Sequence, residues 1–138
     1  MGRVGRGRDN AGVPPIVRVL IVDDQAPFRR AANAVVAATP AFEAVAEAAD
    51  GAEAVELATT LAPALVLMDI NMPGMDGIEA SRRITADHPG TVVVLLSTYE
   101  ADDLPEQAAA CGAVGYVHKE DFGPGVLQAI WQQHGDAA

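Results

Sequence analysis

The sequence predicts an α/β protein whose five-stranded parallel sheet is covered by helices on both faces. Short apolar runs alternate with longer segments in which apolar residues recur at helical spacing. The apolar runs are nearly continuous, which is typical of strands buried on both faces of a parallel sheet. With 138 residues, half of them hydrophobic, the chain can build the core of one domain.

The first two strand–helix repeats span residues 17–62. VRVLIV at 17–22 is an apolar run with one arginine and predicts a buried strand, whereas FEAVAEA at 42–48 predicts a weaker one. A helix is expected over 27–39, because its apolar residues fall on one face: Phe28, Ala31, Ala32, Val35 and Val36. GAEAVELATTLA at 51–62 is expected to be the second helix, with Val55, Ala58 and Leu61 on one side.

Three further repeats complete the chain. The expected strands are ALVLM at 64–68, TVVVLL at 91–96 and VGYVH at 114–118. The expected helices are IEASRRITADH at 78–88, LPEQAAAC at 104–111 and GVLQAIWQQHG at 125–135. Asp102 or Asp103 can cap the helix at 104–111, and Pro105 is tolerated because it falls in the first turn. Crossovers should be right-handed, which gives a doubly wound (βα)5 sheet.

The composition along the chain predicts one domain with short extensions at both ends. Residues 1–15 are rich in glycine and arginine and should form a disordered leader, residues 16–134 the domain, and residues 135–138 a short tail without an output domain. No apolar run approaches the roughly 18 residues of a membrane span, and no signal peptide begins the chain. The single cysteine, Cys111, cannot form an internal disulfide. We expect a soluble cytoplasmic protein without membrane contact.

The charge of the domain argues against nucleic-acid binding. The formal net charge is −10, from 19 acidic and 9 basic residues. From Val19 onward, five bases stand against eighteen acids, a formal charge of −13. A surface of this sign repels DNA phosphates, so we expect no direct nucleic-acid binding by this domain.

Polar side chains follow four of the five predicted strands. They are Asp23 and Asp24 after the first, Asp69 after the third, Ser97 and Thr98 after the fourth, and His118 and Lys119 after the fifth. If the strand order is 2-1-3-4-5, the first and third strands are neighbours, and ligands of such sheets bind at the carboxyl ends of the strands. Each residue alone is more often a cap, a turn former or a solvated charge. Together they predict a site.

The residue types of this site indicate a divalent cation and a phosphoryl group. Carboxylates a few ångströms apart cannot all stay ionised without a cation, and Mg²⁺ takes carboxylate oxygens together with water and phosphate oxygens. Lys119 is the only lysine of the chain, among eight arginines. A lysine ammonium is a compact charge on a long stem and can move between a carboxylate and a phosphoryl oxygen.

These residues carry a family resemblance. VLIVDDQ, LVLMDINMPGMDGIEA, VVVLLST and GYVHKED resemble the response-regulator receiver domain of two-component signalling, over about Val17 to Gln133. The resemblance implies a flavodoxin-like fold. Because no proline follows the lysine, the ending YVHKED is more similar to receivers of the NarL/FixJ type.

The resemblance implies a role for each residue of the site. Asp69 would accept the phosphoryl group from a phosphohistidine of a sensor histidine kinase. Asp23, Asp24 and Asp69, with the backbone carbonyl of Asn71, would bind Mg²⁺. Ser97 and Lys119 would contact the phosphoryl group, and Tyr116 would be the switch aromatic that turns inward as Ser97 moves. Pro73 and Gly77 would shape the loop after Asp69. The readout surface, and the contact of a homodimer, would be the fourth helix, fifth strand and fifth helix.

Two departures from the family pattern leave questions open. Thr98 stands where the family often has alanine or glycine, so either Ser97 or Thr98 could supply the hydroxyl, although the spacing to Lys119 favours Ser97. Glu120 stands where many members have proline, and a cis peptide before a residue other than proline would cost about 2.5–4 kcal/mol.

Three other functions compete with a phosphoacceptor switch. The first is an interaction module that keeps the fold and works without phosphorylation, but such modules usually lose part of the acidic pair or the lysine, and here the set is complete. The second is a Mg²⁺-dependent aspartyl phosphatase, which would want an acid where Asn71 stands. The third is an FMN-binding protein, which would want a Ser/Thr-rich loop after the first strand instead of DDQAPF.

Overall fold

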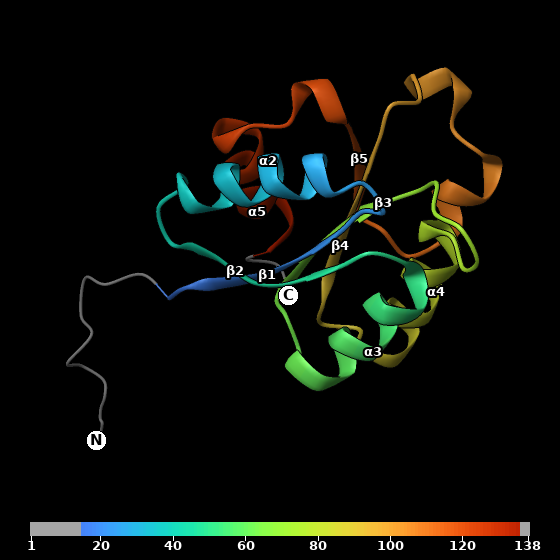
Figure 1. Cartoon of the computed structure of the whole chain (residues 1–138), viewed down its shortest axis with the longest axis horizontal. Coiled ribbons are helices and arrows are strands. Elements are labelled where there is room, and N and C mark those ends of the chain that lie inside the picture. The colour runs from blue at the N-terminus through green and yellow to red at the C-terminus, as the bar shows by residue number, and fades with distance from the viewer. Residues whose placement is uncertain (1–14, 136–138) are drawn as a thin grey trace.

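The computed structural model describes residues 15–135, and Figure 1 shows one central sheet between two layers of helices. Its strands are β1 (Val17–Val22), β2 (Phe42–Ala48), β3 (Leu65–Asp69), β4 (Val92–Ser97) and β5 (Gly115–His118). All neighbouring strands are parallel, and their order is β2-β1-β3-β4-β5. The predicted fold class and strand order are therefore confirmed.

Four α-helices cover the sheet, two on each face (Figure 1). They are α2 (Ala26–Ala37), α3 (Gly51–Leu61), α4 (Gly77–Asp87) and α5 (Pro124–His134). Asp50 and Asp76 begin α3 and α4, because each carboxylate accepts a hydrogen bond from a backbone N–H three residues later, at 2.8 and 2.9 Å. These two helices thus start where the sequence offers a capping side chain, whereas α2 and α5 have no side-chain cap and begin with a proline in the first turn.

The two faces of the sheet bury separate apolar clusters. Val19 and Ile21 of β1 lie with Val36 of α2 and Leu127 of α5 in one cluster. The alternate residues of the same strands, such as Leu20 and Val22, pack with α3 and α4 in the other cluster, which also buries Cys111. β3 and β4 are buried along their whole length, as their continuous apolar runs predict. This rigid centre fixes the strand ends at which the predicted site lies.

The segment between β4 and β5 departs from the expected α-helix at 104–111. It forms two short 3₁₀ helices, η1 (Ala101–Asp103) and η2 (Glu106–Ala110), and Asp102 and Asp103 belong to η1 instead of capping η2. Pro105 has an extended ψ of 143° just before η2, and Gly112 has a φ of 94° just after it. A helical run confined to five residues gains few hydrogen bonds for its nucleation cost, so it stays 3₁₀.

The predicted leader lies outside the described residues apart from Pro15, as does the tail at 136–138. Within residues 15–135, no helix has both the length and the apolar character that crossing a membrane requires. The Lys119–Glu120 peptide is trans. A third short 3₁₀ helix, η3 (Lys119–Asp121), follows β5 directly and turns the chain toward α5.

Candidate functional site

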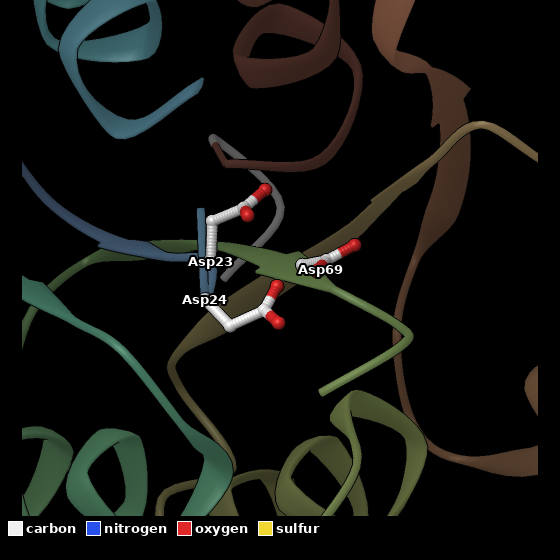
Figure 2. A group of neighbouring side chains, drawn as sticks. All are labelled: Asp23, Asp24 and Asp69. Carbon is white, nitrogen blue, oxygen red and sulfur yellow. The ribbon is translucent and has the colours of Figure 1, made fainter. Parts of the chain in front are cut away.

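The carboxylates of Asp23, Asp24 and Asp69 meet at one edge of the sheet, as Figure 2 shows. Asp23 and Asp24 follow β1 and Asp69 ends β3, and the two strands are hydrogen-bonded neighbours. One carboxylate oxygen from each residue lies within 4.8 Å of the others. Asp23 and Asp69 are buried, with 1% and 5% exposure, whereas Asp24 is exposed. The structure therefore brings together the three acids that the sequence singled out.

Lys119 reaches into this cluster from the end of β5. Its Nζ lies 2.6 Å from Oδ2 of Asp23 and 3.3 Å from Oδ1 of Asp69. The ring of Phe28, in the first turn of α2, lies 4.5 Å from the same nitrogen and forms a cation–π contact. The side chain is only 13% exposed. Lys119 therefore supplies the one cationic group that the structure places against these buried carboxylates among residues 15–135.

Arg29 supports the carboxyl end of β1 from α2. Its Nη1 donates to the backbone carbonyl of Asp23 at 2.7 Å, and its Nε pairs with Glu47 of β2 at 3.0 Å. The Asp23 carboxylate is fixed further by the backbone N–H of Gln25, which donates to Oδ1 at 2.8 Å. Arg29 is therefore a structural support of the strand end, whereas its neighbour Arg30 is exposed.

The local environment disfavours the charged form of Asp69. Burial, and next the charge of Asp23, raise the pKa of Asp69 to about 6, against the opposing attraction of Lys119. A buried carboxylate with this pKa and an acidic neighbour gains from a bound cation, which would compensate both causes. The donor set is three carboxylates, the oxygen ligands that Mg²⁺ takes. The residues present thus fit a hard divalent cation.

Ser97 and Tyr116 are joined through the backbone of the loop after β4. Ser97 ends β4 at 2% exposure, one residue beyond the partner of Asp69 in the sheet, whereas Thr98 is exposed. The Tyr116 hydroxyl donates to the carbonyl of Ser97 at 3.0 Å and also bonds the carbonyl of Tyr99. Burial, followed by the charges of Glu100 and Asp121, raises the pKa of Tyr116, so its hydroxyl remains a donor. Between the two hydroxyl residues left open by the sequence, burial favours Ser97.

The loop after β3 contains the remaining predicted residues. Asn71 and Pro73 are exposed, and the Asn71 side-chain oxygen lies 3.4 Å from the hydroxyl of Tyr99. Gly77 is the first residue of α4, and its N–H donates to the carbonyl of Ile70 at 2.9 Å. This contact folds the loop back on the end of β3. It brings the start of α4 directly against the backbone of Asp69.

The substitution Gly77→Ala should both destabilise the fold and displace the backbone of Asp69. A Cβ at residue 77 would lie 1.8 Å from the carbonyl oxygen of Asp69, which is backbone and cannot move aside cheaply. We expect a loss of roughly 2 kcal/mol or more in the free energy of unfolding, measured by urea denaturation. Gly90→Ala is the matched control, since a Cβ at that residue would meet no heavy atom within 4 Å. Gly74→Ala is not suitable, because residue 74 has a φ of 75°, which strains any residue with a Cβ.

Sequence reasoning missed Phe28, Arg29 and Tyr99 as parts of this site. Phe28 and Arg29 lie in the first turn of the helix that follows the acidic pair, and that position brings them back over the end of β1. Tyr99 is two residues beyond Ser97. All three residues are close in sequence to the end of a strand, and this closeness could have been used to predict them. His118, which precedes Lys119, accepts a hydrogen bond from the N–H of Glu120 at 3.1 Å and lies 3.3 Å from Glu100.

Comparison with known proteins identifies the family. Residues 19–131 match the family described as the response regulator receiver domain. The chain belongs to this family. The signal receiver domain of the putative response regulator NarL from Mycobacterium tuberculosis superposes with a TM-score of 0.79 at 31% identity, over 87% of this chain and 97% of that one. This similarity confirms the expected resemblance to NarL-type receivers.

The curated proteins similar to this chain include both transcriptional regulators and enzymes. The transcriptional regulatory protein DegU of Brevibacillus brevis is 35% identical over 83% of this chain and 48% of its own length. A protein-glutamate methylesterase/protein-glutamine glutaminase of Myxococcus xanthus is 44% identical over 78% of this chain and 31% of its own length. The chain therefore spans about a third to a half of the length of these relatives.

Proposed function

We propose that this receiver domain is a phosphoacceptor switch in which Asp69 takes a phosphoryl group from the phosphohistidine of a sensor histidine kinase. The observation that carries the proposal is the buried Asp69 carboxylate, which shares the ammonium of Lys119 with the carboxylate of Asp23. Phosphoryl transfer passes through a loose transition state, so catalysis consists mainly of alignment and charge neutralisation. A carboxylate nucleophile beside a fixed ammonium supplies both. The domain is not itself an enzyme acting on an outside substrate.

The residues of the site divide the work of binding and transfer. One oxygen of Asp69 attacks the phosphorus, and the bond to the histidine nitrogen breaks as the acyl phosphate forms. Lys119 leaves the carboxylate for the phosphoryl oxygens, since its Nζ already lies 3.3 Å from Asp69. Ser97 donates its hydroxyl hydrogen to the same group. Asp23, Asp24, Asp69 and the carbonyl of Asn71 would hold Mg²⁺, which neutralises phosphoryl charge when bound.

The phosphoryl group would change the loop between β4 and η1. It adds about −1.5 to −2 charge at pH 7 beside Ser97. The N–H of Tyr99 donates to Ser97 Oγ at 3.3 Å. When the Ser97 side chain rotates to donate its hydroxyl hydrogen to the phosphoryl group, Oγ moves away from this N–H and the hydrogen bond is lost. Because Tyr116 bonds the carbonyls of both Ser97 and Tyr99, the change passes to β5. The readout surface is then η2, β5 and α5.

An interaction module that needs no phosphorylation is the alternative from another class. Such a module would gain nothing from a lysine buried on two carboxylates, whose desolvation costs folding free energy. The complete set of site residues therefore favours the switch. The homodimer through η2, β5 and α5 stays a prediction, and so do the sensor kinase and the division of the chain into leader, domain and tail.

Intact mass after incubation with a small acyl phosphate tests the proposal. With Mg²⁺ the parent protein should gain one phosphoryl group, and it should gain none when the metal is chelated. Asp69→Asn should gain none in either case, whereas Asp76→Asn, which changes an exposed cap of α4, should match the parent. A parent that binds Mg²⁺ and takes no phosphoryl group from either an acyl phosphate or a phosphorylated kinase would contradict the switch.

A further inference from the structure

An apolar hollow of about 490 Å³ lies between η2 and β5. Its lining includes Leu95, Leu104, Ala108, Ala113, Val114 and Tyr116. Val114 is 39% exposed, and among residues 15–135 only Ile16 joins it as a large hydrophobic side chain that is clearly exposed. The volume is within the range of about 300–1,000 Å³ that ligand pockets occupy.

The hollow has its origin in the 3₁₀ segment that replaces the expected α-helix. Five residues of η2 carry the sequence EQAAA, so this segment offers β5 little more than alanine methyl groups. β5 is also the edge strand of the sheet, with β4 as its single strand neighbour. Small lining residues beside an unpartnered strand edge leave room for a bulky apolar side chain from elsewhere.

A second hollow of about 510 Å³ continues this surface toward the carboxyl end of β5. It is lined by Glu100, Tyr116, Val117, His118, Glu120 and Asp121, and it shares Tyr116 with the apolar hollow. Residues 100–121 contain six acids and, apart from His118, one base, Lys119. Because Lys119 points to Asp23 and Asp69, it does not neutralise this surface. A carbon-lined hollow thus adjoins a strongly negative one.

We infer that the two hollows form one docking groove for a segment of another protein that carries a bulky apolar side chain next to lysine or arginine. The apolar side chain fills the space between η2 and β5, and the cation lies among Glu100, Glu120 and Asp121. This inference rests on the proposed function, because the groove is part of the proposed readout surface. It names the chemistry of the partner, which the proposed function leaves open.

Charge favours such a partner over the second copy of this chain that the predicted homodimer would place on this face, so the two predictions compete for one surface. A two-fold dimer sets the same patch against itself, so each acidic hollow would meet another acidic hollow or its neighbour. No arginine of the described domain lines either hollow. Arg18 is in β1 and Arg29 and Arg30 are in α2, and of the two arginines in α4, Arg82 comes near Pro105 but is paired with Glu79. Like charges brought together at an interface cost binding free energy, whereas a cationic partner gains it and also associates faster.

The test uses the whole chain and three labelled ten-residue peptides, built from leucine with lysine, leucine with glutamate, and serine with lysine. Fluorescence anisotropy should give measurable binding for the leucine–lysine peptide alone. Val114→Asp, which places a charge on an already exposed wall of the apolar hollow, should weaken it roughly tenfold. The pair Glu100→Gln and Glu120→Gln should weaken it about three- to tenfold and reduce the dependence of binding on salt concentration.

The matched control pair is Glu56→Gln and Asp87→Asn, which removes two exposed acids of α3 and α4 that line neither hollow and changes the net charge equally. Equal weakening by the control pair would mean general charge attraction and would overturn the groove. If sedimentation detects a concentration-dependent dimer that Val114→Asp abolishes, the groove is an interface between two copies of this chain, and the inference is also overturned. Phosphoryl uptake, measured on the same variants, tests the proposed function separately, since Asp69 makes its ion pair with Lys119 and with none of the substituted residues.

Discussion

Without metal, the ionisation of Asp69 should remove unfolding free energy on the order of 3 kcal/mol as the pH rises from 3.8 to above 6, and Asp69→Asn should abolish this contribution. The pKa of Asp69 rises from 3.8 in an open chain to about 6 in the fold, because the carboxyl is buried beside Asp23. Between these two pH values the folded state holds a proton that the unfolded chain has released. Its stability therefore falls with rising pH.

The sign follows from counting protons at each pH. Below 3.8 both states are protonated at this carboxyl and nothing is lost, and above about 6 both are ionised and the full penalty is present. Other carboxyls act in the opposite direction, as at Glu79, where hydrogen bonding to Arg83 lowers the pKa. The quantity to compare is therefore the difference between parent and variant, which isolates Asp69.

Urea denaturation from pH 3.5 to pH 8 in a chelating buffer measures this effect. Asp69→Asn should be more stable than the parent at pH 7 by nearly the full amount, and equally stable at the acid end. Mg²⁺ at pH 7 should stabilise the parent and affect the variant much less, because the variant lacks one of the three carboxylates. Asp87→Asn, an exposed acid at the end of α4, is the control and should follow the parent. Parallel curves for the parent and Asp69→Asn would refute the prediction.

Replacing Lys119 should separate metal binding from phosphoryl transfer. Lys119→Met keeps most of the length of the side chain and removes the ammonium that lies on Asp23 and Asp69. The three carboxylates then lack their cation, so Mg²⁺ should bind at least as tightly as in the parent. The rate of phosphoryl uptake from an acyl phosphate should nevertheless fall roughly 10²–10³-fold, as when one donor to a developing charge is removed.

Single-turnover uptake rates at saturating Mg²⁺, with metal affinity measured by calorimetry, check this expectation. Lys119→Arg should recover little, because a planar guanidinium does not fit the narrow space among Asp23, Asp69 and the ring of Phe28. Arg30→Met removes an exposed cation from α2 and is the control. If Lys119→Met takes up the phosphoryl group at the parent rate, Lys119 is a structural partner of the carboxylates and has no part in the transfer.

Most of the fold can be predicted from the sequence, because its strands are buried on both faces. A continuous apolar run such as 92–97 has few alternatives once helices on either side of it are expected. The carboxyl ends of parallel strands share one edge of the sheet, so the pattern places Asp23, Asp69, Ser97 and Lys119 at that edge, and the strand order 2-1-3-4-5 brings them together. Each of these residues ends a strand or directly follows one, so its position can be predicted from its neighbours in the sequence.

The segment at 101–114 is predicted less well, because its structure depends on packing more than on pattern. EQAAA is favourable for an α-helix, yet Pro105 and Gly112 limit its length and its alanines bury little against the sheet. The apolar hollow beside β5 follows from that outcome, so the sequence pattern does not predict it. The 3₁₀ form of η2 is also the reason why the readout surface has a groove.

The sequence by itself determined the fold class and the identity of the acidic residues, since these follow from periodicity and from the polar residues at the strand ends. The strand order entered as a hypothesis, and the pairing of β1 with β3 in the structure confirms it. Only the tertiary structure decided what each side chain contacts. It places Arg29 against the Asp23 carbonyl, sets the ring of Phe28 over Lys119, and buries Ser97 while exposing Thr98. Such contacts join residues far apart in the chain, and their distances depend on how the layers pack.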